Sequence, residues 1–545
     1  RIADAAERAR RAEIGLRGAE YLRLSRTQEA ISAGAERASA GSPRLAALTR
    51  RSQDVRQELD ALYVALLRRL DDTPADADTA ALRRRVALLE QERNALHQRL
   101  RTEHPAFWQL AYPRSARVAD LARALAPDEV FIGIQPVAKV TLVWAVTPQG
   151  RIEMAASPVG ADEVAAIVKS LRRPMDASIV TLEGLAPFDV DAAYRLYETL
   201  LAPLADVWHP ATQLVVSAGG ALGHLPFALL VAAPDPLPLS AKASSTTPEP
   251  TLRYAQYRNV AWLARTHAVT HVPSGAALIS LRAVKSPAAG RAFFGVGDPQ
   301  FGTAPSARAA TRALRRAGVT RSAAAADPDP LVAPALPALL RTYANLPALP
   351  ETRDEIIAIG AALGADLGRD AFFGAAATRA QVRAADLADR RVVAFATHGL
   401  LPGDLPLLEE PALALSAGAA NDSPLLTLTD ILTLQLNADW VVLSACNTAS
   451  ADGRGGDAIS GLGRGFFYAG ARALLVTHWE VETESARDLV SGTFMRYAHT
   501  TVARAQALRA AQLALIERGQ DRSGRVSYAH PLFWAGYAVV GDGGR

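Results

Sequence analysis

The fold is decided by Arg391-Val-Val-Ala-Phe-Ala-Thr-His398-Gly399 and Trp440-Val-Val-Leu-Ser-Ala-Cys446-Asn-Thr, two short apolar runs that each end in a reactive side chain. Runs of this length that are rich in valine are typical of buried β-strands. A parallel pair of strands requires a crossover of a dozen or more residues, and the 40 residues between the runs provide it. Because ligands bind outside the carboxyl ends of strands in open α/β sheets, we expect His398 and Cys446 to share one rim.

Cysteine and histidine at neighbouring strand ends can cooperate in nucleophilic catalysis. Cys446 is the only cysteine of the chain. A thiol attacks as its thiolate, and the imidazole of His398 can take or stabilise the thiol proton. The backbone N–H groups of Gly399 and Cys446 can stabilise an oxyanion, because glycine lets the chain approach closely. A lone cysteine or histidine at a strand end is more often a packed side chain, so the residues alone leave both interpretations open.

Length and composition describe a chain that buries apolar cores. At about 150 residues per domain, 545 residues predict two to four domains. Half of the residues are hydrophobic and 21% are charged, which excludes a chain that is disordered throughout. A single cysteine excludes a disulfide framework and a multi-cysteine zinc site, and no histidine pair has metal-ligand spacing. We therefore expect no metal and no other cofactor.

No segment of the sequence marks a membrane or secreted protein. No apolar run approaches the roughly 18 residues that span a bilayer, and the chain opens Arg1-Ile-Ala-Asp-Ala-Ala-Glu without an apolar signal segment. We expect a protein of the reducing cytoplasm without a membrane partner. Because the chain opens without methionine, we also expect that it begins inside a longer protein or has been trimmed.

The charge pattern does not favour a nucleic-acid partner. The net charge is +4, and residues 1–105 account for it with 20 Lys and Arg against 16 Asp and Glu. Acidic residues are interleaved with these arginines, and no basic stripe results. Nucleic-acid binding is therefore not expected.

The first 105 residues are expected to be helical. Residues 1–40 predict an amphipathic helical segment, and residues 41–105 predict an antiparallel helical hairpin. Asp71-Asp-Thr-Pro-Ala-Asp76 separates the two helices, because proline ends helices and aspartate favours turns. These helices can be a solvated spacer or a surface for a regulatory protein. The apolar seam has 4–3 spacing, with Arg93 in one slot, and comprises Val55, Leu59, Leu62, Leu66, Leu70, Leu82, Val86, Leu89, Leu96 and Leu100.

After Pro113 short β-rich runs alternate with helical runs, a pattern typical of a mostly parallel α/β sheet covered on both faces. A turn signal at Thr147-Pro-Gln-Gly150 follows the second run, and a helix is expected over 191–204. Two segments, 234–250 and 301–347, resemble surface insertions. Strands are expected at 129–134, 140–146, 213–217, 269–272, 293–297, 391–397, 440–445 and 471–477.

Three further motifs support weaker hypotheses. Gly461-Leu-Gly463-Arg-Gly465 resembles half of a nucleotide-binding loop, but the full spacing is missing and the segment opens a helix. Asp452-Gly-Arg-Gly-Gly-Asp457 follows Cys446 and offers an acid for substrate recognition. His478 ends another strand beside Trp479, where packing is the simpler interpretation.

Several motifs resemble the CHAT domain, a caspase-like domain associated with tetratricopeptide repeats and related to separases. The catalytic half carries Ala396-Thr-His398-Gly399, Leu443-Ser-Ala-Cys446-Asn-Thr and the run from Gly461 to Trp479. Caspase-type peptidases place their histidine about 50 residues before the cysteine, and here the interval is 48 residues. The resemblance covers about residues 106 to 545 and includes Tyr194-Arg-Leu-Tyr-Glu, Leu222-Gly-His-Leu-Pro226-Phe227, Val272-Pro-Ser274, Leu349-Pro350-Glu351-Thr-Arg-Asp-Glu and His530-Pro-Leu-Phe-Trp534.

This resemblance implies a caspase-like, bilobal α/β domain with mostly parallel sheets, preceded by an α-helical hairpin. It implies a helical segment at 1–40 that ends a repeat array, a hairpin linker at 41–105, an N-terminal lobe without the dyad at 106–345, and a catalytic lobe at 346–545. It also implies that His398 and Cys446 are the dyad of a cysteine endopeptidase. Relatives usually carry an aspartate shortly after the third strand, where this chain has Glu482; Asp457 and Glu482 are therefore the candidate substrate-binding residues.

We accordingly predict a CHAT-type cysteine endopeptidase that cleaves a protein substrate and is regulated by its N-terminal helices, a repeat region or a partner protein. The alternative is a caspase-like scaffold without turnover, an interaction module in bacterial signalling. A thiol-dependent acyl transferase that uses the same two residues is a third hypothesis. A buried Cys446, or a His398 beyond hydrogen-bond reach of its sulfur, would favour the scaffold.

Overall fold

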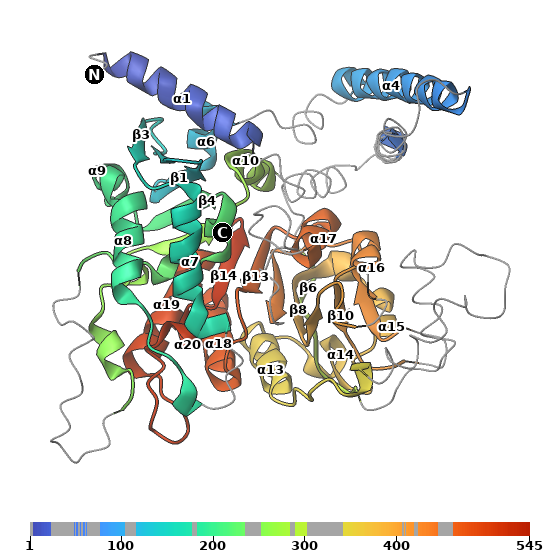
Figure 1. Ribbon diagram of the computed structural model, residues 1–545. Helices are drawn as coiled ribbons and strands as arrows, with labels where there is room; N and C mark the ends of the chain where they lie inside the picture. Colours follow the sequence, from blue (N-terminus) through green and yellow to red (C-terminus); the bar gives the residue numbers. More distant parts are fainter. Residues whose placement is uncertain are drawn as a thin grey trace.

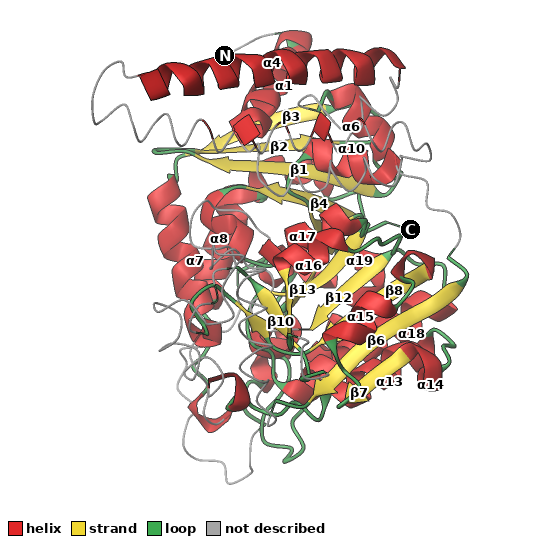
Figure 2. Cartoon of the chain, turned by 90° about the vertical axis from the view of Figure 1, so that its right-hand side faces the viewer, coloured by secondary structure: helices red, strands yellow, loops and turns green. Residues whose placement is uncertain are grey.

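The computed structural model shows an α/β molecule built around a single sheet with helices on both faces (Figures 1 and 2). Its eleven strands have the order β3-β2-β1-β4-β5-β14-β13-β12-β8-β6-β7. The structure describes residues 4–22, 48, 51–52, 55, 58–59, 62, 77–103, 116–176, 182–234, 252–283, 289–301, 342–405, 408, 410–418, 423–444 and 461–544.

The predicted mostly parallel sheet is confirmed. Among the described strands seven of the ten neighbouring pairs are parallel, and β1–β2, β2–β3 and β13–β14 are antiparallel. All of the runs expected to be strands belong to it. The strands are β1 (Glu129–Pro136), β2 (Thr141–Val146), β3 (Ile152–Ser157), β4 (Gln213–Ala218), β5 (Ala268–His271), β6 (Arg291–Pro299), β7 (Ala371–Gly374), β8 (Arg390–Ala396), β12 (Trp440–Ser444), β13 (Ala473–Thr477) and β14 (Tyr537–Gly541).

The strand β14 was not among the expected strands, and it interrupts the parallel order of the sheet. β14 runs antiparallel to β13 and parallel to β5 in the interior of the sheet, and all five of its residues are buried. A strand covered on both faces is a continuous apolar run whichever way it points, so its sequence does not reveal its direction. The turn expected at Thr147–Gly150 is present between β2 and β3, where Gly150 has a φ of +83°.

Each face of the sheet has its own apolar core, because side chains alternate along a strand. Val392, Ala394 and Ala396 of β8 face one core, and Val393 and Phe395 face the other. The first core is covered by α7 (Ala161–Asp176), α8 (Val190–Leu200), α13 (Thr352–Ala362), α18 (Thr483–His499), α19 (Arg504–Arg518) and α20 (Pro531–Trp534). The short helices α9 (Ala205–Trp208) and α14 (Leu367–Asp370) also pack against this first core. The opposite face is covered by α1 (Ala5–Leu22), α6 (Val118–Ala124), α10 (Gly275–Ala283), α15 (Arg379–Ala384), α16 (Leu428–Thr433) and α17 (Gly461–Ala469).

The crossover between β8 and β12 contains more structure than the expected helix. A separate antiparallel sheet is formed by β9 (Gly399–Leu400), β10 (Ala412–Ala414) and β11 (Leu425–Thr427). The helix of this crossover is α16, and Thr427 and Asp430 form a reciprocal capping box at its start. The glycine-rich segment at 461–465 begins α17, where a Cβ on Gly465 would lie 2.7 Å from Leu428 Cδ1. Helix packing therefore accounts for this glycine.

Helix α1 is bound to the sheet domain by both apolar and polar contacts. Leu16 is fully buried in the core that α1 shares with α6 and α10. The Glu13 carboxylate accepts the Val118 N–H at 3.1 Å. The Glu20 carboxylate accepts the Ala116 N–H at 2.9 Å and the Gly275 N–H. Two acidic residues of α1 thus satisfy amide groups at the starts of α6 and α10.

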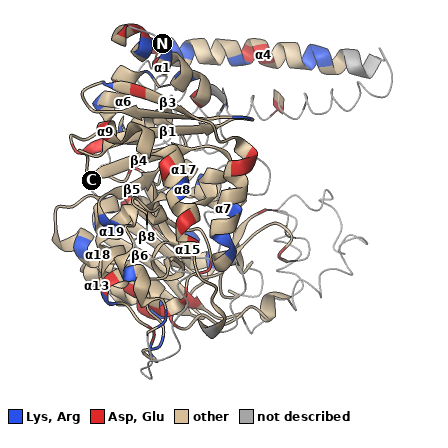
Figure 3. Cartoon of the chain, turned by 60° about the vertical axis from the view of Figure 1, so that its left-hand side comes forward, with Lys and Arg blue, Asp and Glu red and all other residues tan. Residues whose placement is uncertain are grey.

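Helix α4 (Ala77–Glu103) lies apart from the sheet domain and pairs with the helical residues described between 48 and 62 (Figures 1 and 3). Arg51 pairs with Glu92 and Glu58 pairs with Arg85, so the two stretches run antiparallel. Acidic and basic residues alternate along α4 (Figure 3). The seam between the stretches contains buried Leu48, Val55, Leu59, Val86, Leu89, Leu96 and Leu100, and Leu66 and Leu70 lie outside the described residues.

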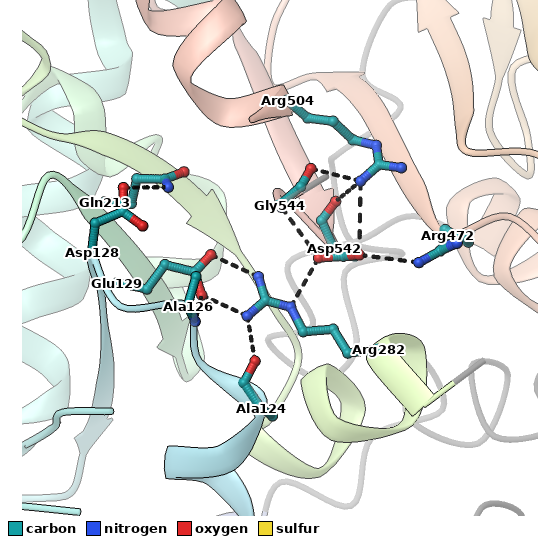
Figure 4. Close-up of polar contacts among 10 residues, drawn as sticks. All are labelled: Ala124, Ala126, Asp128, Glu129, Gln213, Arg282, Arg472, Arg504, Asp542 and Gly544. Atoms are coloured by element: carbon teal, nitrogen blue, oxygen red, sulfur yellow. Dashed lines mark hydrogen bonds and ion pairs between the residues drawn. The ribbon is translucent and has the colours of Figure 1, made fainter. Parts of the chain in front are cut away.

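A cluster of buried ion pairs joins the start of β1 to the end of β14 and the start of β13 (Figure 4). Arg282 of α10 donates to the Glu129 carboxylate at 2.5 and 2.7 Å and to Asp542 at 2.9 Å. Asp542 also lies 3.6 Å from Arg472 and 3.7 Å from Arg504. Glu129 and Asp542 are each 2% exposed, so this cluster, hereafter the Arg282 cluster, neutralises acids that water does not reach.

Candidate active site

The expected parallel pair of β8 and β12 is present, and its register aligns the two reactive positions. Ala396 pairs with Ser444, and the Thr397 N–H donates to the Ser444 carbonyl at 3.2 Å. His398 follows Ala396 by two residues, and Cys446 follows Ser444 by two residues. Cys446 and Asp457 lie outside the described residues. The described chain therefore brings the strand ends that lead to His398 and Cys446 side by side.

His398 is half-buried and its ring is held from two sides. Its Nε2 atom lies 2.8 Å from the Pro347 carbonyl oxygen, and the Phe301 ring lies 5.3 Å from the imidazole, centroid to centroid. A carbonyl can only accept, so Nε2 carries a proton in this contact. In the neutral ring Nδ1 is then the basic nitrogen. The Pro347 contact was not predicted, because a backbone carbonyl has no residue-type signature.

Gly399 begins the small sheet directly after His398. The Ala414 N–H donates to the His398 carbonyl at 3.0 Å, and Gly399 is paired with Leu413. In an antiparallel ladder this arrangement directs the Gly399 N–H away from β10. Thr397 anchors the same turn through a hydrogen bond from its hydroxyl to the Ala414 carbonyl. The Gly399 amide therefore has the orientation that an oxyanion donor needs with respect to its own sheet.

Of the two substrate-binding candidates, Glu482 lies within the described residues, where it caps a helix. Its carboxylate accepts the Glu484 N–H at 3.2 Å and the Ser485 N–H at 2.8 Å, at the start of α18. The adjacent Glu484 pairs with Arg522. A basic substrate group at Glu482 would have to compete with these helix amides.

A buried acid lies at the end of β12, next to the catalytic candidates. The Ser444 hydroxyl donates to Glu355 Oε2 at 3.0 Å and lies 2.5 Å from the Tyr537 hydroxyl. Glu355 belongs to α13 and is 4% exposed. Burial raises the pKa of Glu355 to about 7, against the lowering effect of the Ser444 hydrogen bond. Sequence reasoning missed this contact, whose partners are 89 residues apart in the chain.

His478 is packed, as its position beside Trp479 suggested. It is 2% exposed, and its ring lies 6.1 Å from the His271 ring. Burial lowers the pKa of His478 well below its usual value, with His271 adding to the effect.

In the described part of the chain, no group of three or more His, Cys, Asp or Glu side chains is arranged to hold a metal ion. No helix within the described ranges is long and apolar enough to cross a membrane.

The chain belongs to the CHAT domain family, whose model matches residues 190–542. No curated protein sequence matches the chain. Among solved structures it is similar to two crystal structures of the Saccharomyces cerevisiae separase–securin complex, at 9% sequence identity and TM-scores of 0.35 and 0.39. In each case the match covers 85% of this chain and 33% of the other, so the chain spans about a third of that protein's length.

Proposed function

We propose that this protein is a cysteine endopeptidase in which Cys446 is the nucleophile and His398 is its base. The observation that carries the proposal is the pairing of Ala396 with Ser444, from which both residues follow at the same offset. Strand ends at one rim of a parallel sheet are where α/β proteins collect reactive groups. The family membership and the histidine–cysteine interval support the same assignment.

In the proposed reaction Nδ1 of His398 takes the Cys446 thiol proton, and the thiolate attacks the scissile carbonyl carbon. The Pro347 carbonyl holds the ring in the tautomer that leaves Nδ1 unprotonated, and it stabilises the imidazolium that forms. The amides of Gly399 and Cys446 are proposed as oxyanion donors. The imidazolium then protonates the leaving amine as the carbon–nitrogen bond breaks. Water, deprotonated by His398, hydrolyses the thioester and restores the thiol.

Asp457 and Glu482 stay proposed substrate-binding residues. For regulation through the N-terminal helices, the support is the contact of α1 with the starts of α6 and α10. Any signal that displaces α1 would leave these amides without their acceptors. The domain limits at 40, 105 and 345 stay predictions.

The test is cleavage of a complex protein mixture, followed by mass spectrometry of newly formed amino termini. The wild type should produce new termini that Cys446→Ala and His398→Ala do not produce. His499→Ala, which removes an exposed histidine at the end of α18, should behave like the wild type. Equal sets of termini from the wild type and Cys446→Ala would refute the assignment.

The scaffold and transferase hypotheses predict other products. A scaffold yields no new termini, and an irreversible peptide inhibitor directed at thiols does not label Cys446 faster than free cysteine. A thiol acyl transferase leaves the substrate's acyl group on an acceptor amine, which the same mass spectra detect as an added mass.

A further inference from the structure

Ser444 connects the end of β12 to three other parts of the molecule. Its carbonyl accepts the N–H of Thr397, the residue before His398. Its hydroxyl contacts Glu355 of α13 and Tyr537 of β14. Ser444 also precedes Cys446 by two residues. Ser444 therefore links Glu355 and Tyr537 to the strand that precedes His398 and to the chain that leads to Cys446.

Glu355 is unusual because it is a buried acid without a cation. Its Oε2 has the Ser444 hydroxyl, and its Oε1 has no hydrogen-bond partner within the described chain. Buried carboxylates are normally paired with a positive charge or with several donors. Five arginines on α13 and on elements packed against it pair with other acids: Arg353 with Asp298, Arg369 and Arg390 with Asp370, Arg291 with Asp389, and Arg487 with Asp488. Arg391 of β8 lies over the Tyr497 ring, and none of the described arginines pairs with Glu355.

The three hydroxyl and carboxyl groups can be connected in two ways with the same heavy-atom positions. When Glu355 is ionised it can only accept, so Ser444 donates to Glu355 and Tyr537 donates to Ser444. When Glu355 is protonated it can donate to Ser444, and Ser444 can then donate to Tyr537. The contacts of 3.0 and 2.5 Å suit either direction.

We propose that Glu355 is a positioning residue that acts through Ser444, and that its proton selects between two hydrogen-bond arrangements at the strand ends leading to His398 and Cys446. This inference rests on the proposed function, since it assigns a regulator to the same site. Ionised Glu355 places a negative charge without a described cation beside Ser444, and protonated Glu355 is neutral. Because burial raises the pKa of Glu355 to about 7, both forms are populated near neutral pH.

The single cysteine makes the inference testable without a substrate. Alkylation of Cys446 by iodoacetamide can be followed by intact mass from about pH 5.5 to about pH 9, because no other thiol reacts. In the wild type, the rate should show a step near pH 7 in addition to the ionisation of the thiol. Glu355→Gln keeps the shape and removes the titration, so the step should vanish, with a change of about fivefold in rate at one side of neutrality.

Two further variants locate the effect. Glu351→Gln changes an exposed glutamate one turn earlier on the same side of α13, and it should keep the wild-type profile. Ser444→Ala leaves Glu355 in place and breaks the link, so it should also lose the step; this variant keeps the test valid if Glu355→Gln does not fold. A wild-type profile in either Glu355→Gln or Ser444→Ala would overturn the inference.

Failure of the proposed function gives a different result. A cysteine–histidine pair lowers the pKa of the thiol, and His398→Ala should remove this lowering at Cys446. If His398→Ala alkylates as the wild type does, the dyad is wrong, whatever Glu355 does. If His398→Ala changes the profile and Glu355→Gln does not, the dyad is supported and the positioning role of Glu355 is wrong.

Discussion

Buried acids have different kinds of partner at the two ends of β12. At its start, the Arg282 cluster surrounds Asp542 and Glu129 with arginines (Figure 4). Asp439, which precedes β12, lies 3.5 Å from Arg504 of this cluster. At its end, Glu355 has one hydroxyl donor and no cation among the residues that the structure describes. Paired charges hold elements together, whereas an unpaired buried acid is costly and is usually kept for function. The comparison separates an end of the strand with paired buried charges from the end at which we propose the chemistry.

The largest effect is expected from His398→Ala, which tests the end assigned to chemistry. Loss of the base should lower cleavage, or peptide-inhibitor labelling of Cys446, by about a thousandfold. The free energy of unfolding should change by no more than about 1 kcal/mol, because the side chain is half-buried and makes one hydrogen bond. Enzyme assays and urea denaturation measure the two quantities. A large loss of stability with retained activity would reverse the comparison.

Arg282→Met tests the end assigned to stability. The methionine fills similar space but leaves Glu129 and Asp542 buried without this partner, which should cost about 3–5 kcal/mol in urea denaturation. Arg123→Met is the control, since Arg123 is 75% exposed and pairs with Asp120 on the surface. The control should cost less than about 1 kcal/mol. Equal losses in the two variants would mean that the Arg282 cluster does not stabilise the fold.

The pH dependence of stability separates Glu355 from the paired acids. Its pKa is about 7 in the folded chain and 4.5 ordinarily, so between these values the folded state binds one proton more than the unfolded state. Stability from this group is therefore present below pH 4.5 and is lost as the pH rises to about 7, by about 3 kcal/mol in total. Glu355→Gln should lack this loss.

The measurement is the free energy of unfolding of wild type and Glu355→Gln at about pH 5 and about pH 8. The wild type should lose stability relative to the variant on going to the higher pH. Glu351→Gln should lose as much stability as the wild type between the two pH values. If Glu355→Gln also loses as much as the wild type, Glu355 ionises normally in the folded chain.

Glu20→Gln is expected to have the smallest effect. Glu20 is another buried acid, 4% exposed, and its carboxylate accepts two backbone amides. The amide replaces one accepting oxygen with a donor, which should cost about 1–2 kcal/mol and loosen α1. Hydrogen exchange of α1 and urea denaturation measure both. Glu7→Gln is the control, because Glu7 contacts only the exposed Arg11 and Arg10 of its own helix among the pairs described; equal loosening in both would refute the docking role of Glu20.

Much of the fold could be predicted from local patterns. The strands β1, β2, β4, β5, β6, β8, β12 and β13 and the Thr427 cap have signatures of apolar content, length and capping residues that neighbours in the chain determine. The short strands β3, β7, β9, β10 and β11 were not expected. The direction of a strand could not be predicted from its sequence, and β14 shows why. A strand buried on both faces has the same composition in either orientation.

The sequence by itself determined that one thiol is available for the proposed chemistry, and it favoured His398 over His478 through the family resemblance and the interval of 48 residues. Only the tertiary structure decided what holds them: the Pro347 carbonyl on His398, and Glu355 and Tyr537 on Ser444. These partners are 51, 89 and 93 residues away in the chain, and one of them is a backbone group. No local pattern encodes such contacts, since they exist only after the sheet and α13 have packed together and excluded water.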